Sequence, residues 1–193
     1  MTVVITLPQL FEGEEGCICS FLENGTADLV HIRKPDLPLA DMKRLVRRIL
    51  DEANRRGMDI SDKLVLHSHF SLAAKYRLYG IHLGMRSPLP PFSWHGSVSH
   101  SCHSVYEVAE WKKVCDYVSL SPVFDSISKV GYRHAFTDSE LMEAKARGVI
   151  DSKVLALGGV TFNKIPLVMR MGFGGGMILG DAWRVQSAAT DVN

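Results

Sequence analysis

Eight short hydrophobic runs recur along the chain. They span residues 2–6, 29–33, 63–67, 80–84, 97–101, 116–121, 153–159 and 175–180. Most of these runs are rich in Val, Ile and Leu, are too short for helices, and end in Gly, Ser, His or Pro. This pattern is typical of parallel strands that are buried on both faces.

Stretches with a helical pattern lie between several of the runs. Residues 39–57 place Arg and Lys opposite an apolar stripe, which consists of Leu39, Met42, Leu45, Val46 and Ile49. Residues 104–113 begin with Ser104 and carry Glu107 three positions later, the spacing of a capping box. Residues 137–148 open on Thr, Asp and Ser and close on a glycine. We predict a helix for each stretch.

Strands that alternate with helices favour an α/β fold, and eight of them favour a compact (β/α)8 TIM barrel. A doubly wound open sheet is the second choice. With 193 residues the chain is slightly short for such a barrel, so some crossovers must be brief. The proline-rich segment 85–96 is expected to be a loop. No linker or repeat divides the sequence, and we expect one domain over residues 1–193.

Composition and net charge exclude only a few classes of function. The net charge of +1 gives no general attraction to nucleic acid or to an anionic membrane, so any anion site must be local. No apolar run approaches the roughly 20 residues that span a bilayer. The N-terminus lacks the features of a signal peptide, which predicts a cytoplasmic location. The four cysteines form no Cys-x-x-Cys pair and are expected to be reduced thiols, with Cys115 buried.

The loops that follow the last strands carry residues suited to an anion. In a barrel of this kind the site lies at the strand ends, often with a phosphate near strands 7 and 8. The expected phosphate-binding residues are Ser126, Ser128, Lys129, Gly158, Gly159 and Gly180. Hydroxyl and ammonium groups bind phosphate oxygens, and glycine lets the backbone approach a ligand. A solvated surface loop is the alternative for the Ser and Lys residues.

Basic residues also end the second run, at His31, Arg33 and Lys34. Alternate residues of a strand share a face, so Arg33 should point the same way as His31. A cation that points inward needs an anion or a carboxylate as its partner. For Arg33, substrate binding and an internal salt bridge are both open at this stage.

Histidines and a cysteine cluster in two segments and raise the question of zinc. The residues concerned are His67, His69, His100, Cys102 and His103. Imidazole and thiolate are the ligands that zinc prefers, but none of the common ligand spacings is present. Neighbouring residues of a strand also point in opposite directions. We therefore predict that these residues hold no structural zinc tightly.

Several strings, in order along the chain, resemble the family of thiamin phosphate synthase and its relative, the thiazole tautomerase TenI. They are "HIRK", "YGIHLG", "SCHSVYEV", "DYVSLSPVFDSISK" and "LALGGVTFNKIPLVMRMGFGG". Family members show Ser-x-His-Ser where this chain has residues 101–104. They also show Gly-Pro-Val-Phe and then Thr-x-Thr-Lys within the segment that matches residues 121–129. The resemblance implies a barrel that binds phosphorylated thiazole and pyrimidine compounds.

The resemblance also implies roles for single residues. Ser101 would face the ligand, whereas His103 would brace the end of its strand. Ser126, Ser128, Lys129 and Gly159 would hold phosphates and the polar edges of the substrates. Arg33 would match the Arg of the family's Gln-x-Arg-x-Lys stretch. His31 replaces the Gln of that stretch, as in thiazole tautomerases, and Lys34 lies one position before its Lys.

The family's magnesium ligands are missing. The synthases hold Mg²⁺ with two Asp residues, and this chain has Ser68 and Ser87 in their places, with Arg86 beside the second. Neutral hydroxyls are poor substitutes for carboxylates as Mg²⁺ ligands. We therefore expect no tightly bound cofactor, and Mg²⁺ only together with a pyrophosphate substrate. The tautomerases also lack these ligands, but their proton-carrying His is Pro122 here.

The expected protein is an enzyme of thiamin biosynthesis. It is either a divergent synthase, a transferase that joins the pyrimidine and the thiazole and releases pyrophosphate, or a thiazole tautomerase, an isomerase. His67 and Ser101 are the candidate catalytic residues, and His67 would carry the proton in the tautomerase. A non-catalytic barrel that binds phosphorylated ligands is the third alternative. The expected partners are small phosphorylated molecules, with no nucleic acid and no membrane; a homo-oligomer is left open.

Overall fold

Eight parallel strands form one closed barrel in the order β1 to β8, as a computed structural model shows. The structure describes residues 1–84, 94–125 and 135–184. The strands are β1 Thr2–Ile5, β2 Leu29–Ile32, β3 Leu64–Leu66, β4 Gly80–Leu83, β5 Ser97–Cys102, β6 Tyr117–Leu120, β7 Val154–Ala156 and β8 Gly175–Ile178. Seven of the predicted runs contain one strand each, and β5 extends one residue beyond the fifth run. The barrel prediction is confirmed, and the alternative of an open sheet is wrong.

The strands are short because each crosses a packed interior. All residues of β2, β3, β4, β6, β7 and β8 are buried. Burial on both faces explains why the runs are continuously apolar rather than alternating. Five polar residues within strands are buried as well: His31, His82, Ser99, His100 and Ser119.

The contacts divide the chain into two compact units, described separately below. The first unit, Ile5–Ser99, contains helices α1 Glu14–Glu23, α2 Leu39–Arg55 and α3 Phe70–Lys75. The second unit, Met1–Val4 with His100–Asn193, contains α4 Val105–Trp111, α5 Asp138–Ala146 and α6 Ile165–Arg170. One-turn helices follow or precede several strands: η1 Ser61–Lys63, η2 Phe162–Lys164 and η3 Asp181–Trp183. The expectation of a single domain stays a prediction.

Helix α2 confirms the amphipathic stripe with one correction. Its buried residues are Met42, Leu45, Val46, Ile49 and Ala53. Leu39 was predicted to belong to the stripe but is 50% exposed, because it is the first helical residue and lies at the end of the packed face. The helix stops before Gly57, whose φ of +73° is a left-handed conformation that glycine adopts without strain.

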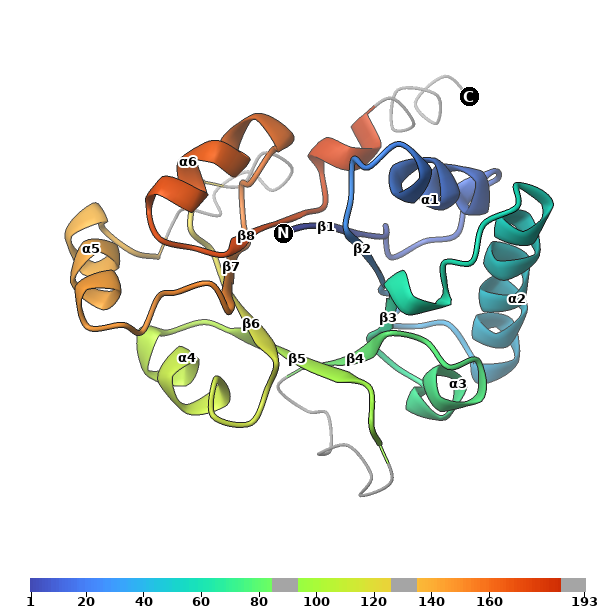
Figure 1. Cartoon of the computed structure of the whole chain (residues 1–193), viewed down its shortest axis with the longest axis horizontal. Coiled ribbons are helices and arrows are strands. Elements are labelled where there is room, and N and C mark those ends of the chain that lie inside the picture. Colours follow the sequence, from blue (N-terminus) through green and yellow to red (C-terminus); the bar gives the residue numbers. More distant parts are fainter. Residues whose placement is uncertain (85–93, 126–134, 185–193) are drawn as a thin grey trace. The chain divides into compact units, whose positions relative to one another are not determined.

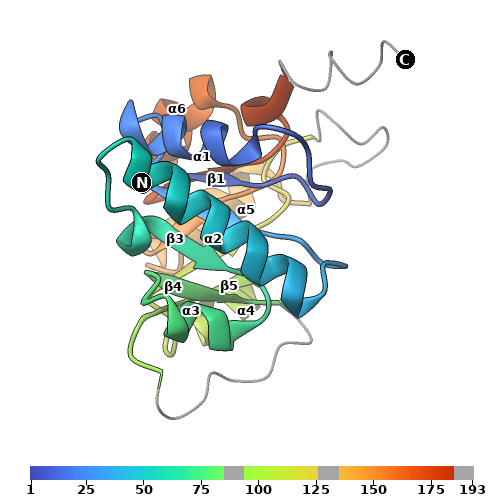
Figure 2. The same cartoon turned by 90° about the vertical axis from the view of Figure 1, so that its right-hand side faces the viewer.

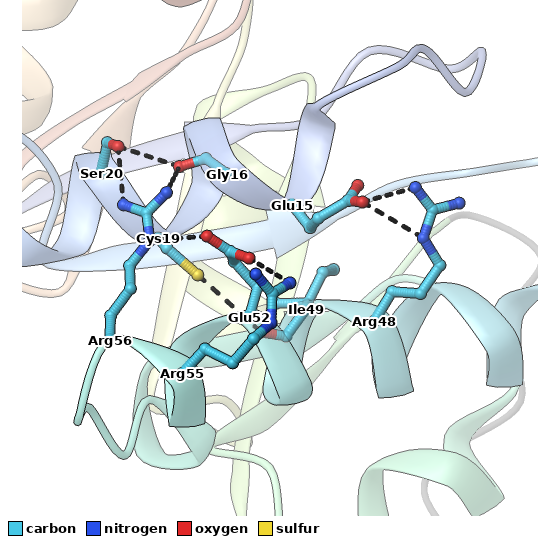
Figure 3. Close-up of polar contacts among 9 residues, drawn as sticks. All are labelled: Glu15, Gly16, Cys19, Ser20, Arg48, Ile49, Glu52, Arg55 and Arg56. Carbon is cyan, nitrogen blue, oxygen red and sulfur yellow. Dashed lines mark hydrogen bonds and ion pairs between the residues drawn. The ribbon is translucent and has the colours of Figure 1, made fainter.

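Helices α1 and α2 lie side by side in both views (Figure 1; Figure 2). Each helix buries apolar residues, and polar contacts of Arg48 and Arg56 join the two helices. Arg48 pairs with Glu15, and the Nε of Arg56 donates to Glu52 at 2.7 Å (Figure 3). Arg56 also donates to the hydroxyl of Ser20 at 3.0 Å. The Arg residues that the sequence places opposite the stripe therefore cover the edge of a helix pair.

The capping signals of α4 and α5 are also confirmed. Ser104 accepts a hydrogen bond from the amide of Glu107 and caps α4. In α5 the Thr137 hydroxyl accepts from the Glu140 amide, and the Glu140 carboxylate accepts from the Thr137 amide. This reciprocal pair satisfies two of the N–H groups that a helix start leaves open.

The capping box of α5 leads to a first prediction. The change Thr137→Ala is expected to lower the free energy of unfolding by about 1 kcal/mol, because it removes the acceptor for an open helix N–H group. Urea denaturation measures the difference. Thr161 is a matched control, since it caps η2 without a side-chain hydrogen bond. An equal loss in Thr161→Ala would contradict the capping explanation.

Helices α1, α3 and α6 have weaker sequence signals. Helix α1 follows Gly13, which is left-handed and supplies no side-chain cap, while α3 and α6 have six residues each.

Segment 85–96 was predicted to be a loop; residues 94–96 are irregular, and the rest lies outside the described residues. None of the four cysteines, all of which lie in the described part of the chain, forms a disulfide bond, and Cys115 is buried as expected. None of the helices in the described residues is long and apolar enough to cross a membrane.

Candidate functional site

Three histidines gather at neighbouring strands of the first unit. His31 belongs to β2, His67 follows the last residue of β3, and His82 belongs to β4. His31 Nδ1 lies 3.0 Å from His67 Nε2, a hydrogen-bond distance. The rings of His67 and His82 are stacked with centroids 4.2 Å apart, and His31 meets both rings edge-on at 5.1 and 5.2 Å. We call these three residues the histidine cluster.

A serine orients one ring of the histidine cluster. The hydroxyl of Ser99, in β5, lies 2.8 Å from His82 Nδ1 and 3.3 Å from the carbonyl oxygen of Ile81. When the hydroxyl donates to that carbonyl, it accepts from His82, which places a proton on Nδ1. In this tautomer the lone pair of His82 is on Nε2. Ser99 therefore acts on the chemistry of the cluster through His82.

Burial keeps the imidazoles of His31 and His67 neutral. It lowers the pKa of His31 well below the ordinary value, and the charge on His82 would lower it further. The pKa of His67 falls for the same first reason, with added repulsion from His82, His31 and Arg33. Neutral rings can accept a proton or a metal ion, but they attract no phosphate by charge. His31, predicted to bind substrate, can do so only as a neutral hydrogen-bonding group.

Arg33 and Lys34 follow His31 in the sequence, but they have different environments. Arg33 comes directly after β2 and is exposed, so its guanidinium can meet an anion from solvent. Lys34 is fully buried. Its ammonium donates to the carbonyls of Leu7 and Gln9 at 2.7 Å and to the Glu14 carboxylate at 2.5 Å.

The structure gives Lys34 internal partners, and its predicted binding of substrate stays a prediction. An ammonium has three N–H donors, and all three have acceptors within the protein. The sequence left an internal ion pair open for Arg33, but in the structure Lys34 forms one, with Glu14. Burial lowers the pKa of Lys34 and raises the pKa of Glu14, because it disfavours the charged form of each group. The attraction between the two charges opposes this desolvation cost.

The residues in place of the family's magnesium ligands do not fit that ion. The hydroxyl of Ser68 is buried and has no hydrogen-bond partner among the described residues, and it carries no charge. Ser87 and Arg86 lie outside the described residues. The convergent group of potential metal ligands in the described structure consists of imidazoles alone. Because Mg²⁺ prefers carboxylate oxygens, we assign no step to a protein-held magnesium ion.

The glycine pair after β7 has the predicted unusual backbone. The φ angles of Gly158 and Gly159 are +88° and +62°. A side chain at Gly158 would approach Pro122, and one at Gly159 would lie 2.2 Å from the carbonyl oxygen of Asp125. These glycines therefore let two loops of the second unit pack closely. Their binding of phosphate stays a prediction.

Only some of the remaining predicted residues lie in the described part of the chain. Ser101 lies in β5, and its hydroxyl accepts from Ser119 at 3.4 Å. His103 Nδ1 lies 3.2 Å from the carbonyl oxygen of Ser121, so it links the residue after β5 to the residue after β6. Gly180 has a φ of −61° before the one-turn helix η3. Ser126, Ser128 and Lys129 lie outside the described residues, and their roles stay predictions.

Apart from His67, the residues considered for zinc have other surroundings. His69 Nε2 contacts the carbonyl oxygen of Leu37 at 2.8 Å. His100 stacks on Trp111 with centroids 3.8 Å apart, and Cys102 is buried beside it. No group that includes His69, His100 or Cys102 converges among the described residues as the histidine cluster does.

Sequence reasoning missed His82 and Ser99. Both are buried in strands that read as hydrophobic, and a single polar residue in such a run is ordinarily a satisfied core residue. A usable signal was present: His31, His67 and His82 occupy the ends or interiors of three successive runs. Neighbouring parallel strands bring such residues together when their registers agree, as Leu66 and Ile81 do here.

Comparison with known proteins matches this barrel to one family. The family model described as thiamine monophosphate synthase matches residues 3–179. A thiamine-phosphate synthase of Photorhabdus laumondii is 24% identical over 163 residues, which are 81% of this chain and 73% of the relative.

Solved structures extend the similarity to the whole chain. The thiamine phosphate pyrophosphorylase of Bacteroides thetaiotaomicron is 36% identical, with a TM-score of 0.81, and the match covers 100% of this chain and 89% of that one. The thiamine phosphate pyrophosphorylase of Pyrococcus furiosus shares the fold, with a TM-score of 0.70, 20% identity, and coverage of 93% and 85% of the two chains. Because the family model covers nearly all of the sequence, this chain belongs to the thiamine monophosphate synthase family.

Proposed function

We propose that the chain is a thiamin-phosphate synthase, a transferase that joins a hydroxymethylpyrimidine pyrophosphate to a hydroxyethylthiazole phosphate. The observation that carries the proposal is the 36% identity, over the full chain, with a solved thiamine phosphate pyrophosphorylase. In the reaction the bond between the pyrimidine methylene carbon and the pyrophosphate oxygen breaks, and the electron pair leaves with pyrophosphate. The thiazole nitrogen then forms the new bond to that carbon.

The difficult part of this reaction is the charge on the departing pyrophosphate. Cations and N–H donors that face this charge lower the barrier. Arg33 supports such a role, because it is exposed directly after β2. Ser126, Ser128 and Lys129, together with the Gly158–Gly159 backbone, are proposed to hold phosphate groups. Since Ser68 and Ser87 stand in place of the family's two magnesium-binding Asp residues, these groups would carry more of the stabilisation than in a typical synthase.

A tautomerase-like activity is the second candidate, and one observation favours it. His67 is partly exposed, so a substrate can reach its ring, whereas the lowered pKa of that ring opposes proton uptake. Product analysis separates the two reactions, because the synthase releases pyrophosphate whereas the tautomerase shifts a proton within one thiazole. Binding of thiazole phosphate without either product would select a non-catalytic barrel.

The proposal also covers the ligands, the cellular location and the source of any Mg²⁺. The proposed ligands are small phosphorylated thiazole and pyrimidine compounds, and no nucleic acid takes part. A cytoplasmic location fits free cysteines and phosphorylated substrates. Any Mg²⁺ would arrive with a pyrophosphate substrate, whose oxygens are themselves good ligands for it.

Lys129 tests the proposed anion site. The change Lys129→Ala is expected to weaken the binding of thiazole phosphate by about 1.5–3 kcal/mol, the contribution of a charge-assisted hydrogen bond. Calorimetry with and without the substitution measures the difference. Lys113→Ala is the control, because Lys113 forms an exposed pair with Glu110. Equal affinities of the original protein and Lys129→Ala would exclude Lys129 from the site.

A further inference from the structure

The histidine cluster has a feature that the proposed synthase reaction does not require. Each of its three members can offer one ring nitrogen, and these nitrogens all lie within 4.8 Å of one another. His31 and His82 are buried, and His67 is partly buried. Three imidazoles in one buried place form a donor set of a kind that proteins use for metal ions.

We propose that His31, His67 and His82 form a binding site for a borderline divalent cation, with Zn²⁺ as the representative ion. Imidazole nitrogens suit Zn²⁺, Ni²⁺ and Cu²⁺, whereas Mg²⁺ and Ca²⁺ favour oxygen ligands. The site is separate from the family's carboxylate-held magnesium, and the inference does not rest on the proposed synthase reaction.

The distances are close to those that a metal requires. With metal–nitrogen distances of about 2.0–2.1 Å and tetrahedral angles, two ligand nitrogens lie about 3.3 Å apart. His31 Nδ1 and His67 Nε2 are already 3.0 Å apart, and all three nitrogens lie within 4.8 Å. A rotation of the His82 ring would be needed to bring the third nitrogen to the same centre. The proton that His31 and His67 share in their hydrogen bond leaves to solvent when the ion binds.

Ser99 supplies the second layer of the site. Its hydroxyl holds the Nδ1 side of His82 by a 2.8 Å contact, and the Ile81 carbonyl in turn accepts from that hydroxyl. Histidine ligands of zinc commonly donate their other ring N–H to such a group, which fixes the tautomer and the ring orientation. Ser99 is therefore a positioning residue, and its contact distinguishes the cluster from three histidines that merely pack together.

Three protein ligands leave a fourth position of a tetrahedral ion open. Zinc sites with three histidines use that position for water or for a ligand atom, whereas structural zinc sites fill all four positions with protein groups. The site differs in this respect from the structural zinc that the sequence argued against. The prediction of no tightly held structural zinc concerned a closed site built from a set of residues of which only His67 belongs to the histidine cluster, so the two statements do not conflict.

The test uses the full-length untagged chain, first stripped with a chelator. Zn²⁺ is titrated in competition with a chromophoric chelator, and Co²⁺ is added separately as a spectroscopic probe of the ligand geometry. We expect one ion per chain and the intense visible absorption of four-coordinate Co²⁺. The variant His67→Gln should lose this absorption and bind Zn²⁺ more weakly than the original protein.

A positioning variant and a control make the test independent of folding defects. Ser99→Ala leaves all three ligands in place and is expected to lower the Zn²⁺ affinity about 10–100-fold. His103→Gln should bind as the original protein does, because His103 is exposed and outside the cluster. Circular dichroism verifies the fold of each variant. Absence of stoichiometric binding, or an affinity unchanged in both His67→Gln and Ser99→Ala, would overturn the proposal, whatever the synthase assay shows.

Discussion

Replacing Lys34 by methionine is expected to lower the free energy of unfolding by about 3–5 kcal/mol, the usual cost of removing one partner of a buried ion pair. The change leaves the Glu14 carboxylate buried without its cation, and it removes the donor to the carbonyls of Leu7 and Gln9. Chemical denaturation measures the loss. Both side chains are essentially inaccessible, at 0% and 1% exposure, so water cannot take the place of the ammonium.

Two further variants identify the cause. Lys43→Met removes an exposed lysine of helix α2 and should change stability by no more than about 0.5 kcal/mol. Glu14→Leu added to Lys34→Met should recover part of the loss, because it removes the unpaired carboxylate while the two carbonyls still lack a donor. A loss below about 1 kcal/mol in Lys34→Met would show that the pair is not important to stability.

Replacing Gly159 by alanine is expected to destabilise the protein by two separate effects. A left-handed backbone costs a residue with a side chain about 1–2 kcal/mol. The new Cβ would also lie 2.2 Å from the Asp125 carbonyl oxygen and 2.9 Å from Phe124 Cβ, so a loop must move at a further cost of about 1–3 kcal/mol. The same movement would disturb the proposed phosphate site, so thiazole phosphate should bind more weakly.

Gly148 separates the two effects. Its φ is +69°, and a Cβ there would meet no atom within 4 Å. Gly148→Ala should therefore show the backbone cost alone, and Gly159→Ala should exceed it by the steric part. Thermal or urea denaturation of both variants gives the comparison. Equal losses would mean that the loop at Asp125 yields without cost.

The barrel could be predicted because its signal is repeated. Each strand that is buried on both faces leaves a run such as residues 29–33 or 63–67, and eight runs in order favour a closed barrel. Helices α2, α4 and α5 were predictable because they carry a stripe or a cap. Helix α1 was not, since Gly13 and Gly16 weaken its local signal and packing on α2 stabilises it instead.

The candidate site was predictable only in outline. The sequence places Arg33 and Lys34 next to each other at a strand end, yet Arg33 is exposed, whereas Lys34 is buried in an ion pair with Glu14. Their separation depends on a carboxylate 20 residues earlier in the chain, which no local pattern reveals. The histidine cluster likewise depends on the register of β2, β3 and β4, which brings His82 to His67.

The central claim is that the chain is a synthase that works without carboxylates to hold Mg²⁺. Pyrophosphate release from both substrates, measured across a Mg²⁺ titration in the original protein and in Ser68→Asp/Ser87→Asp, tests it most directly. We predict slow release by the original protein and faster, more Mg²⁺-dependent release by the paired variant, since carboxylates are preferred ligands of that ion. Fast, Mg²⁺-saturable release by the original protein, or no release by either protein, would contradict the account.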